Sequence, residues 1–361
     1  MKLPVTPPVE PMLAKLVSEM PLETGYAFEP KWDGFRAIVF KDGDEIYIQS
    51  RDRKPLVRYF PELAYSLQKT LPPRVVLDGE IVIATDGTLD FSTLQLRLHP
   101  AKSRIDKLST EHPASFIAFD LLAENDDDLM ETPFSIRRQR LETLLKNAQP
   151  PTYLTPLTRD LDQARKWFHR FEGAGLDGVI AKHEDLLYQP KKRAMLKIKH
   201  RRTADCVVGG FRWHRKGVGE LVGSLLLGLF DETGTLHHVG ITSSFKMDYR
   251  RTLLEELGPL RENALKGHPW ASWAETEAQN AQTDAQRKPG MMSRWTQAKD
   301  LSWEPLRPER VVEVAYDYLQ DGRFRHATTF VRWREDKSPK ACDFAQLEEI
   351  KPFSFDQIFR L

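Results

Sequence analysis

The stretch that decides the fold is Tyr26–Phe40, YAFEPKWDGFRAIVF, in which two apolar runs flank a Pro-Lys-Trp-Asp-Gly break. The break predicts the end of one strand, a tight connection and the start of another. Lys31 then stands at a strand edge, either as an ordinary surface charge or as a rigidly held nucleophile. Because short motifs match often by chance, the break alone favours the surface charge. The rest of the chain has to separate the two.

Length and composition describe a globular chain with real cores. A chain of 361 residues predicts about two domains, at roughly 150 residues each. Hydrophobic residues make up 40% and charged residues 29%, while the net charge of +1 gives no global field for a polyanionic partner. A nucleic-acid surface would therefore need local clustering of the 53 basic residues.

The cysteines and the first residues bear on the cellular compartment. Cys206 and Cys342 lie far apart in the sequence and outside any C-x-x-C, which argues against a disulfide scaffold or a cysteine zinc site. The opening MKLPVTPPVEPMLAKL is broken by proline and has no continuous apolar core, so it is not a secretory signal. No apolar run is long enough to span a bilayer. These features predict a cytoplasmic protein.

The first block, to about residue 202, mixes strand and helix patterns without regular alternation, which predicts an α+β fold with antiparallel sheets. A strand from residue 74 is interrupted at Asp78-Gly79-Glu80. The helix at 135–148 should bury one stripe, formed by Ile136, Leu141, Leu144 and Leu145. Other strands are expected at 26–32, 35–40, 45–49, 114–122, 176–182 and 194–200, and other helices at 61–71, 91–98 and 161–175, the last closed by Gly173 and Gly175.

The second block changes character to short strands separated by Gly-rich turns. Strands are expected at 204–214, 223–231, 236–244, 309–319 and 323–336, with one helix at 247–260. Residues 262–305 are polar and are expected to form a long loop or an appended helix. Short strands with one intervening helix fit a small closed barrel of the OB type. The hinge between the blocks is expected at His200–Asp205.

Polar residues recur at predicted strand ends in a fixed order along the first block. In isolation each has a simple explanation: LDGEIV as a turn, FIAFD as core and LKIK as a half-buried strand. Asp78 and Glu80 are the exception, because carboxylates in an apolar run are costly unless paired. The ordered elements are Lys31, Asp33, Gly34 and Arg36, then Ser50-Arg51, Asp78-Gly79-Glu80, Phe116, Phe119 and Asp120, Asp177-Gly178 and Lys182, and finally Lys197 and Lys199.

In this order the elements resemble the motifs of the covalent nucleotidyltransferase superfamily of polynucleotide ligases and mRNA capping enzymes. Motif I is KWDG, III is LDGEI, IIIa is FIAFD, IV is DGVIAK, V is LKIK, and VI is RFRHATTFVRWREDK. The wording is similar to bacterial ATP-dependent DNA ligases of the small LigC type, related to the ligase module of LigD. The resemblance implies an α+β nucleotidyltransferase domain with antiparallel sheets at 1–202, followed by an all-β OB-fold barrel domain at 203–361.

The resemblance implies that Lys31 attacks the α-phosphate of ATP, forming a lysyl-AMP and releasing pyrophosphate. A free lysine is protonated at neutral pH, and burial and neighbouring cations favour the neutral amine that a nucleophile needs. Lys182, Lys197 and Lys199 match catalytic lysines that would supply this effect and hold the α-phosphate.

The family also assigns nucleotide contacts. Glu29 matches the acceptor for the adenine amino group, and Phe119 matches the ring that stacks on adenine. Arg36 and Glu80 match ribose positions, and Arg51 matches a phosphate contact. Asp177 stands where most relatives carry a glutamate proposed to bind metal, so its shorter side chain puts direct contact in doubt. Asp177 and Glu80 are the candidate ligands for Mg2+ or Mn2+.

Motif VI supplies the basic residues of the second domain. Its basic side chains are either a solvated edge strand that prevents aggregation or a segment that orients the β- and γ-phosphates of ATP. The family favours the second reading, with the barrel swinging about Arg202–Asp205. The residues concerned are Arg323, Arg325, Arg332, Arg334 and Lys337.

The sequence therefore predicts an ATP-dependent DNA ligase that seals nicked duplex DNA in repair, as a monomer with repair-protein partners. Two alternatives stay open. One is an RNA ligase or a GTP-dependent capping-type enzyme, and the other is a non-catalytic OB-type nucleic-acid-binding protein.

Overall fold

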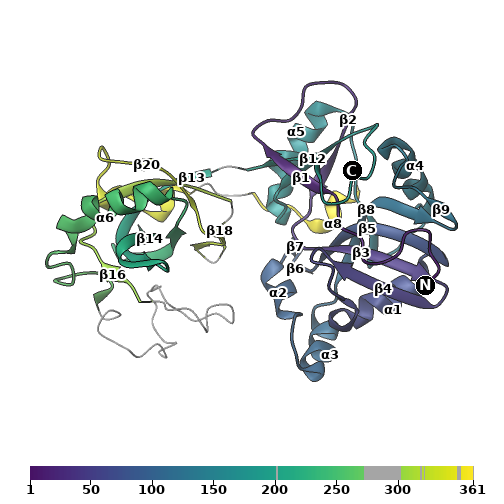
Figure 1. The fold of residues 1–361 in the computed structure, drawn as a ribbon, viewed down its shortest axis with the longest axis horizontal. Helices are drawn as coiled ribbons and strands as arrows, with labels where there is room; N and C mark the ends of the chain where they lie inside the picture. The colour runs from purple at the N-terminus through teal and green to yellow at the C-terminus, as the bar shows by residue number, and fades with distance from the viewer. Residues whose placement is uncertain (201, 272–301, 318, 321, 348–350, 361) are drawn as a thin grey trace. The chain divides into compact units, whose positions relative to one another are not determined.

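The computed structural model describes residues 1–200, 202–271, 302–317, 319–320, 322–347 and 351–360. The chain forms two compact units, which are Met1–His200 together with Ile350–Leu361, and Arg201–Glu349 (Figure 1). The expected domains at 1–202 and 203–361 differ from this division mainly at the end of the chain, where residues 351–360 pack on the first unit. Among the described residues, no helix is long and apolar enough to cross a membrane.

The first unit contains two sheets that are mostly antiparallel, as expected for the α+β class. One sheet has the order β1-β12-β11-β2, and the other has the order β10-β8-β5-β3-β4, with β9 paired to β8. Only β1 with β12 and β10 with β8 are parallel. The strands are β1 Leu13–Val17, β2 Tyr26–Lys31, β3 Phe35–Asp42, β4 Glu45–Ser50, β5 Arg74–Val82, β8 Ser115–Glu124, β9 Asp127–Asp128, β10 Thr152–Leu154, β11 Gly178–His183 and β12 Arg193–Lys199, with a separate small hairpin of β6 Ala84–Thr85 and β7 Thr88–Leu89.

Helices cover the outer faces of these sheets. The α-helices are α1 Pro61–Thr70, α2 Phe91–Leu96, α3 Lys102–Glu111, α4 Phe134–Leu144, α5 Leu161–Arg170 and, near the end of the chain, α8 Phe355–Ile358; 3-10 turns are η1 Val57–Tyr59 and η2 Phe171–Ala174. α4 packs on β8, and α5 packs on β2 and β11. Because the strands of both sheets bury most of their side chains, the apolar cores lie between each sheet and its helices.

Two sequence expectations for these helices are wrong. In α4, Ile136 is 47% exposed, whereas Arg137 and Arg138 are buried. The helix turns these guanidinium groups inward because buried carboxylates from other strands pair with them. α5 ends at Arg170, and the left-handed residue Gly175, with φ of 83°, closes η2 instead. Gly173 is not a cap.

The second unit is built on one antiparallel sheet of order β15-β14-β13-β17-β20, with β16 paired to β13. Its strands are β13 Arg202–His214, β14 Gly217–Phe230, β15 Leu236–Thr242, β16 Glu304–Pro305, β17 Val311–Tyr316 and β20 Thr329–Trp333, with a small ladder of β18 Leu319–Gln320 and β19 Arg323–Phe324; α6 Met247–Arg261, η3 Pro339–Ala341 and η4 Phe344–Gln346 complete it. The free cysteines Cys206 and Cys342 lie buried in its core.

This sheet does not close into a barrel within the described residues. The edge strand β15 meets the segment before β20 through one isolated bridge, Thr242 with Thr328. Three hydrogen bonds hold it: Thr242 Oγ1 donates to the Thr328 carbonyl at 3.0 Å, and the N–H and Oγ1 of Thr328 donate to the Ile241 carbonyl at 2.8 and 3.2 Å. The unit is therefore a strongly curved sheet whose edges touch at one point. Of the segment expected as a loop or helix at 262–305, residues 272–301 lie outside the described residues.

The hinge expected at His200–Asp205 contains the division between the two units, but its part from Arg202 to Asp205 is regular strand. These residues are the start of β13, and they pair in register with β17 from Tyr316 to Glu313. On the other side, the His200 ring stacks on Phe168 with centroids 3.8 Å apart, within the first unit. Each of these flanks is fixed by contacts within its own unit.

Candidate active site

A single pocket of about 210 Å3 in the first unit is lined by most of the residues singled out from the sequence. Both sheets contribute to it, because β2, β11 and β12 supply one wall and β5 and β8 the other. The lining residues are Pro11, Leu13, Ala14, Glu29, Pro30, Lys31, Trp32, Arg36, Arg51, Glu80, Phe119, Ile180, Lys182, Arg193, Met195 and Lys197.

Lys31 is the last residue of β2, and its backbone is held by pairing with β11 and with the residue that precedes β11. It lies opposite Gly178 in the ladder, and its carbonyl accepts a hydrogen bond from the Asp177 N–H at 3.1 Å. Gly178 has φ of 144°, and a Cβ there would lie 2.0 Å from the Ile198 carbonyl. Only glycine fits between these strands, so the position of Lys31 depends on a close backbone contact.

The ammonium of Lys31 pairs with Asp177. Lys31 Nζ lies 2.6 Å from Asp177 Oδ2, and Lys199 Nζ lies 3.1 Å from the same oxygen. Lys31 and Lys199 lower the pKa of Asp177 well below its usual range, against the burial that raises it. Asp177 therefore reaches both Lys31 and Lys199 despite its short side chain.

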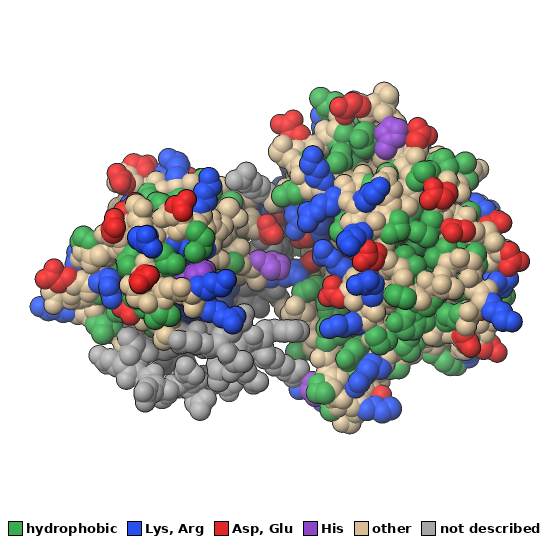
Figure 2. Space-filling model, viewed as in Figure 1, with side chains coloured by type: hydrophobic (Ala, Val, Ile, Leu, Met, Phe, Trp, Pro, Cys, Tyr) green, Lys and Arg blue, Asp and Glu red, His purple; other side chains and the backbone are tan. Residues whose placement is uncertain are grey.

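Lys197 is a different kind of lysine. It lines the pocket, and within the described part of the chain it forms no ion pair. Burial lowers its pKa, and the nearby charges of Lys199 and Lys31 lower it further. An unpaired, partly desolvated cation at this place is suited to a phosphate oxygen. Space-filling colours show Lys and Arg gathered over the part of the first unit that holds β1 and β12 (Figure 2).

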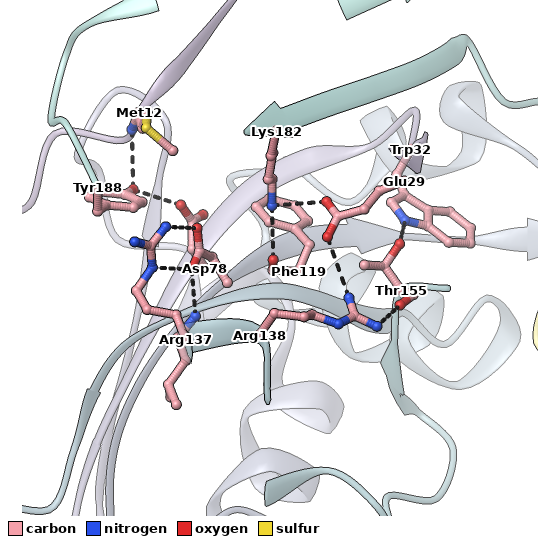
Figure 3. A network of polar contacts seen from close by, with 12 residues as sticks. Met12, Glu29, Trp32, Asp78, Phe119, Arg137, Arg138, Thr155, Lys182 and Tyr188 are labelled. Carbon is pink, nitrogen blue, oxygen red and sulfur yellow. Dashed lines mark hydrogen bonds and ion pairs between the residues drawn. The ribbon is translucent and has the colours of Figure 1, made fainter. Parts of the chain in front are cut away.

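Glu29 and Lys182 form a buried ion pair at another part of the pocket. Lys182 Nζ lies 2.8 Å from Glu29 Oε2 and donates to the Phe119 carbonyl at 2.9 Å (Figure 3). The same ammonium lies 5.0 Å from the centroid of the Phe119 ring. Lys182 was expected among the phosphate-binding lysines, but the structure places it beside Glu29 and Phe119.

Arg138 secures the other oxygen of this carboxylate. Arg138 Nη1 lies 3.4 Å from Glu29 Oε1, and its Nη2 donates to the Thr155 carbonyl at 2.8 Å (Figure 3). All three charged side chains of this network are nearly fully buried. Because a buried carboxylate is stable only when paired, Glu29 is held in one orientation with its oxygens directed by two cations.

Arg36 is fixed by a second buried network. Its Nε and Nη2 each donate to Asp78 at 2.6 Å in a bidentate pair, and its guanidinium lies 4.5 Å from the Phe119 centroid. Tyr188 donates to Asp78 Oδ2 at 2.6 Å and accepts from the Met12 N–H at 3.1 Å, as Figure 3 shows. The pKa of Tyr188 is raised by burial and by the Asp78 charge. This network joins the lead-in segment, β3 and β5 around Phe119.

Glu80 is a carboxyl group that lines the pocket and has a strongly raised pKa. Burial raises its pKa to about 8, although the charges of Arg36 and Lys31 lower it. It lies opposite Arg36 in the ladder between β3 and β5. Arg51 lines the same pocket from the segment after β4 and is exposed.

The two expected ligands of Mg2+ or Mn2+, Asp177 and Glu80, do not form a shared cluster of metal-binding side chains within the described part of the chain. No three His, Cys, Asp or Glu side chains converge anywhere in the described residues. Asp177 and Glu80 are separate carboxylates, and Mg2+ commonly uses one or two carboxylates together with substrate phosphates and water. Either residue fits that role, and neither forms a protein-only metal cage.

The basic residues of motif VI lie in the second unit, and three of them are engaged there. Arg334 Nη1 and Lys337 Nζ lie 2.8 and 2.9 Å from Asp205 Oδ2. Arg332 lies 2.6 Å from Glu313 on the neighbouring strand. Arg323 belongs to β19, and Arg325 follows it. This pairing gives the basic segment a structural role within the unit, which the sequence alone did not indicate.

Arg138, Tyr188 and Thr155 were not predicted from the sequence, although they belong to the hydrogen-bond networks around the pocket. Thr155 supports Trp32, accepting from its Nε1 at 2.9 Å (Figure 3). The available signal was the pair of adjacent arginines in α4 beside a buried strand, since buried guanidinium groups require carboxylate partners.

A strand-end lysine, a buried carboxylate, an aromatic ring and several basic side chains share one pocket, an arrangement suited to binding a nucleotide. The ATP dependent DNA ligase domain matches residues 11–199, and the ATP dependent DNA ligase C terminal region matches residues 218–337. The chain belongs to the ATP-dependent DNA ligase family.

Relatives agree with this assignment over the full chain. It is 55% identical to DNA ligase C2 of Mycolicibacterium smegmatis, covering 96% of each chain. It is 52% identical to DNA ligase C of Mycobacterium tuberculosis, covering 99% of each chain. A solved structure of a Lig E DNA ligase has the same fold, with a TM-score of 0.52, 16% identity, and coverage of 90% of this chain and 99% of the other.

These findings confirm the resemblance to small LigC-type ligases. The chain is a DNA ligase that uses ATP as substrate and acts on DNA. The nucleotidyltransferase domain followed by an OB-type domain is likewise confirmed as fold class, with the correction that the sheet does not close in the described residues.

Proposed function

We propose that Lys31 is the residue that carries AMP, and that sealing proceeds through lysyl-AMP and 5′-adenylylated DNA. The carrying observation is the placement of Lys31 at a rigid strand end in the pocket that also contains Glu29 and Phe119. Lys31 Nζ attacks the α-phosphorus of ATP, and the bond to the bridging oxygen breaks, so that pyrophosphate leaves with that electron pair. AMP then passes to the 5′-phosphate of the nick, and the 3′-hydroxyl displaces it.

The buried pair of Glu29 and Lys182 supports a choice of adenine over guanine. Glu29 offers an acceptor, and Lys182 offers a donor, at neighbouring positions beside the Phe119 ring. Adenine presents an amino donor and a ring-nitrogen acceptor on the same edge, so it complements this pair. Guanine presents the reverse pattern and would place donor against donor. This argument favours an ATP-dependent ligase over a GTP-dependent capping-type enzyme.

The phosphate end is assigned to the lysines around Asp177. Lys197 is the cation best placed to take an α-phosphate oxygen, because it has no ion pair in the described residues and is partly desolvated. Lys199 and Lys31 share Asp177, so a phosphate entering here would replace part of that pairing. Arg51 lines the same region and extends the basic wall.

Asp177, with Glu80, would hold Mg2+ or Mn2+ together with the phosphates of ATP. The bound cation would supply charge neutralisation at the transferring phosphate. Asp177 Oδ2 already contacts two ammonium groups, so it can exchange a lysine for another cation without a large movement.

We further assign Arg36 and Glu80 to the ribose and the motif VI residues Arg323, Arg325, Arg332 and Lys337 to the phosphates of ATP. Arg36 supports this best, because Asp78 and Tyr188 fix its guanidinium beside Phe119. A role in DNA repair, repair-protein partners, a monomeric state and a cytoplasmic location stay predictions from the sequence.

Labelling with α-labelled nucleotide tests the proposal. The wild-type protein is incubated with labelled ATP or GTP and Mg2+, then denatured and separated. Label from ATP that disappears in Lys31→Ala and persists in Lys15→Ala, an exposed lysine of β1, supports the proposal. Labelling from GTP alone would indicate a capping-type enzyme, and absence of label with either nucleotide would contradict Lys31 as the AMP carrier. Sealing of nicked duplex DNA, compared with nicked RNA, then tests the substrate.

A further inference from the structure

The last described residues, 351–360, are an aromatic segment that packs on the first unit. Its sequence is KPFSFDQIFR, and Phe353, Phe355 and Ile358 are buried while Lys351, Asp356 and Gln357 are exposed. The buried side chains share one cluster with Trp32, Trp167 and Phe171 of the first unit. We call residues 351–360 the C-terminal strap.

The first unit has a fitted seat for the backbone of the strap. A Cβ at Gly173 would lie 2.0 Å from the Lys351 carbonyl oxygen and 2.7 Å from the Phe353 nitrogen. The Phe353 N–H donates to the Gly173 carbonyl at 3.1 Å, and the Phe355 N–H donates to the Gly87 carbonyl at 2.6 Å. The absence of a side chain at Gly173 is therefore what lets the strap backbone approach.

The strap ends against the residue that follows Lys31. The Phe359 ring is parallel to the Trp32 indole, with an angle of 5° and centroids 5.5 Å apart, and the Phe355 ring meets it edge-on at 6.0 Å. Tyr153 of β10 stacks on Phe359 at 4.4 Å. Thr155 holds the indole nitrogen at 2.9 Å. Trp32 is only 5% exposed, and the strap together with Thr155, which follows β10, holds it in place.

We propose that the C-terminal strap is a positioning element for lysine adenylylation, acting through Trp32 on Lys31, and that Phe359 is its main positioning residue. The parallel contact between the Phe359 and Trp32 rings resists tilting of the indole. Because a single peptide bond joins Trp32 to Lys31, the orientation of the indole affects the backbone of the lysine. Small displacements of a nucleophile reduce its rate strongly, because attack requires alignment with the leaving group. This inference rests on the proposed role of Lys31 as AMP carrier.

The test compares two aromatic residues of the same strap. Phe359 contacts Trp32, whereas Phe353 stacks on Phe171 at 5.6 Å and lies under Arg170, with no contact to Trp32 among the ring pairs of the described residues. Phe359→Ala and Phe353→Ala therefore remove similar bulk, but only the first removes the contact with Trp32. Phe359→Tyr keeps the ring and serves as the conservative variant.

The rate of AMP–protein formation is measured in the full chain at saturating ATP, alongside sealing of a nick already carrying AMP on its 5′-phosphate. We expect Phe359→Ala to slow AMP–protein formation about tenfold or more, since misalignment acts on the attacking group. Phe353→Ala and Phe359→Tyr should stay within about threefold of wild type, and sealing of the pre-adenylylated nick should change little in any of them. Thermal unfolding reports the loss of stability separately.

Gly173→Ala is an independent way to disturb the contact between the strap and Trp32, because it displaces the strap without altering an aromatic side chain. It should reproduce the Phe359→Ala loss of AMP–protein formation. Rates that follow thermal stability across all variants, or a Gly173→Ala protein that labels like wild type, would overturn the positioning role. Label that persists in Lys31→Ala would instead refute the AMP carrier itself, so the two failures are distinguishable.

Discussion

Lys31 Nζ lies 2.6 Å from Asp177 Oδ2, so an ion pair holds the proposed nucleophile. Asp177 stands at the position where most relatives carry the longer glutamate. Lys31 ends β2 and Asp177 directly precedes β11, the strand paired with it, and Lys199 shares the same oxygen at 3.1 Å. The amine is thus held in place by an ion pair, and phosphate binding must change that pairing before attack.

Asp177 should be more sensitive to loss of charge than to a change of length. Asp177→Asn removes the anion between Lys31 and Lys199, leaving two close ammonium groups, and should slow AMP–protein formation by about a hundredfold. Asp177→Glu keeps the charge and should lose far less. Quenched-flow labelling with ATP measures both rates. Equal losses in the two variants would mean that side-chain length, not charge, sets the role of this position.

Glu80 predicts a pH-dependent stability with a defined sign. Its folded pKa is about 8, above the usual 4.5, so the folded chain retains a proton that the unfolded chain releases. The free energy of unfolding should therefore fall as pH rises from 4.5 and level off above 8, with nothing lost below 4.5.

Glu80→Gln removes this dependence. The variant should gain about 2 kcal/mol over wild type at high pH, a figure reduced for partial hydration of the side chain, and almost nothing near pH 4.5. Urea unfolding across this pH range measures it. Glu111→Gln, an exposed carboxylate at the end of α3, is the control and should show no such trend. If the free energies of unfolding of Glu80→Gln and wild type differed by the same amount at all pH values, the raised pKa of Glu80 would be refuted.

Glu29 should affect both stability and choice of base. Glu29→Gln leaves Lys182 and Arg138 without their shared anion in a buried site, which should cost about 3–5 kcal/mol in the free energy of unfolding. The amide also presents a donor as well as an acceptor, so discrimination between ATP and GTP in AMP–protein or GMP–protein formation should decrease. Chemical unfolding and paired labelling measure these effects. Glu142→Gln, which removes only the exposed partner of Arg138, should leave base choice unchanged.

Lys337 tests the assignment of motif VI to the ATP phosphates. Lys337→Ala should slow AMP–protein formation about tenfold, because the variant lacks a cation that stabilises the negative charge of the leaving pyrophosphate. Sealing of a pre-adenylylated nick should stay near the wild-type rate. Lys340→Ala, an exposed lysine in η3 with no ion pair in the described residues, is the matched control. If Lys337→Ala impaired both reactions equally, its bond to Asp205 would be a structural feature only.

The order of motifs in the sequence was enough to predict the family, the pocket and the place of Lys31 within it. These features are local: a strand end, a glycine and a charge at a short spacing. Partners that come from distant segments were not predictable. Arg137 and Arg138 violate the apolar stripe of α4 because Asp120 and Glu29, on other strands, need cations.

The surroundings of other residues were also not predictable. The family groups Lys182 with Lys197 and Lys199, and the structure adds that its neighbours are Glu29 and the Phe119 carbonyl. Arg202–Asp205 was expected to belong to a hinge, yet backbone pairing with β17 makes it regular strand. Burial and pairing across the fold decide these positions, and neither is visible in a window of the sequence.

The core of the first unit is completed by residues that follow the second unit in the sequence. The chain leaves the first unit after His200, and Phe353, Phe355 and Ile358 are buried in one cluster with Trp32, Trp167 and Phe171. A protein truncated before Lys351 should therefore lose stability in the first unit, although every residue that lines the pocket would still be present.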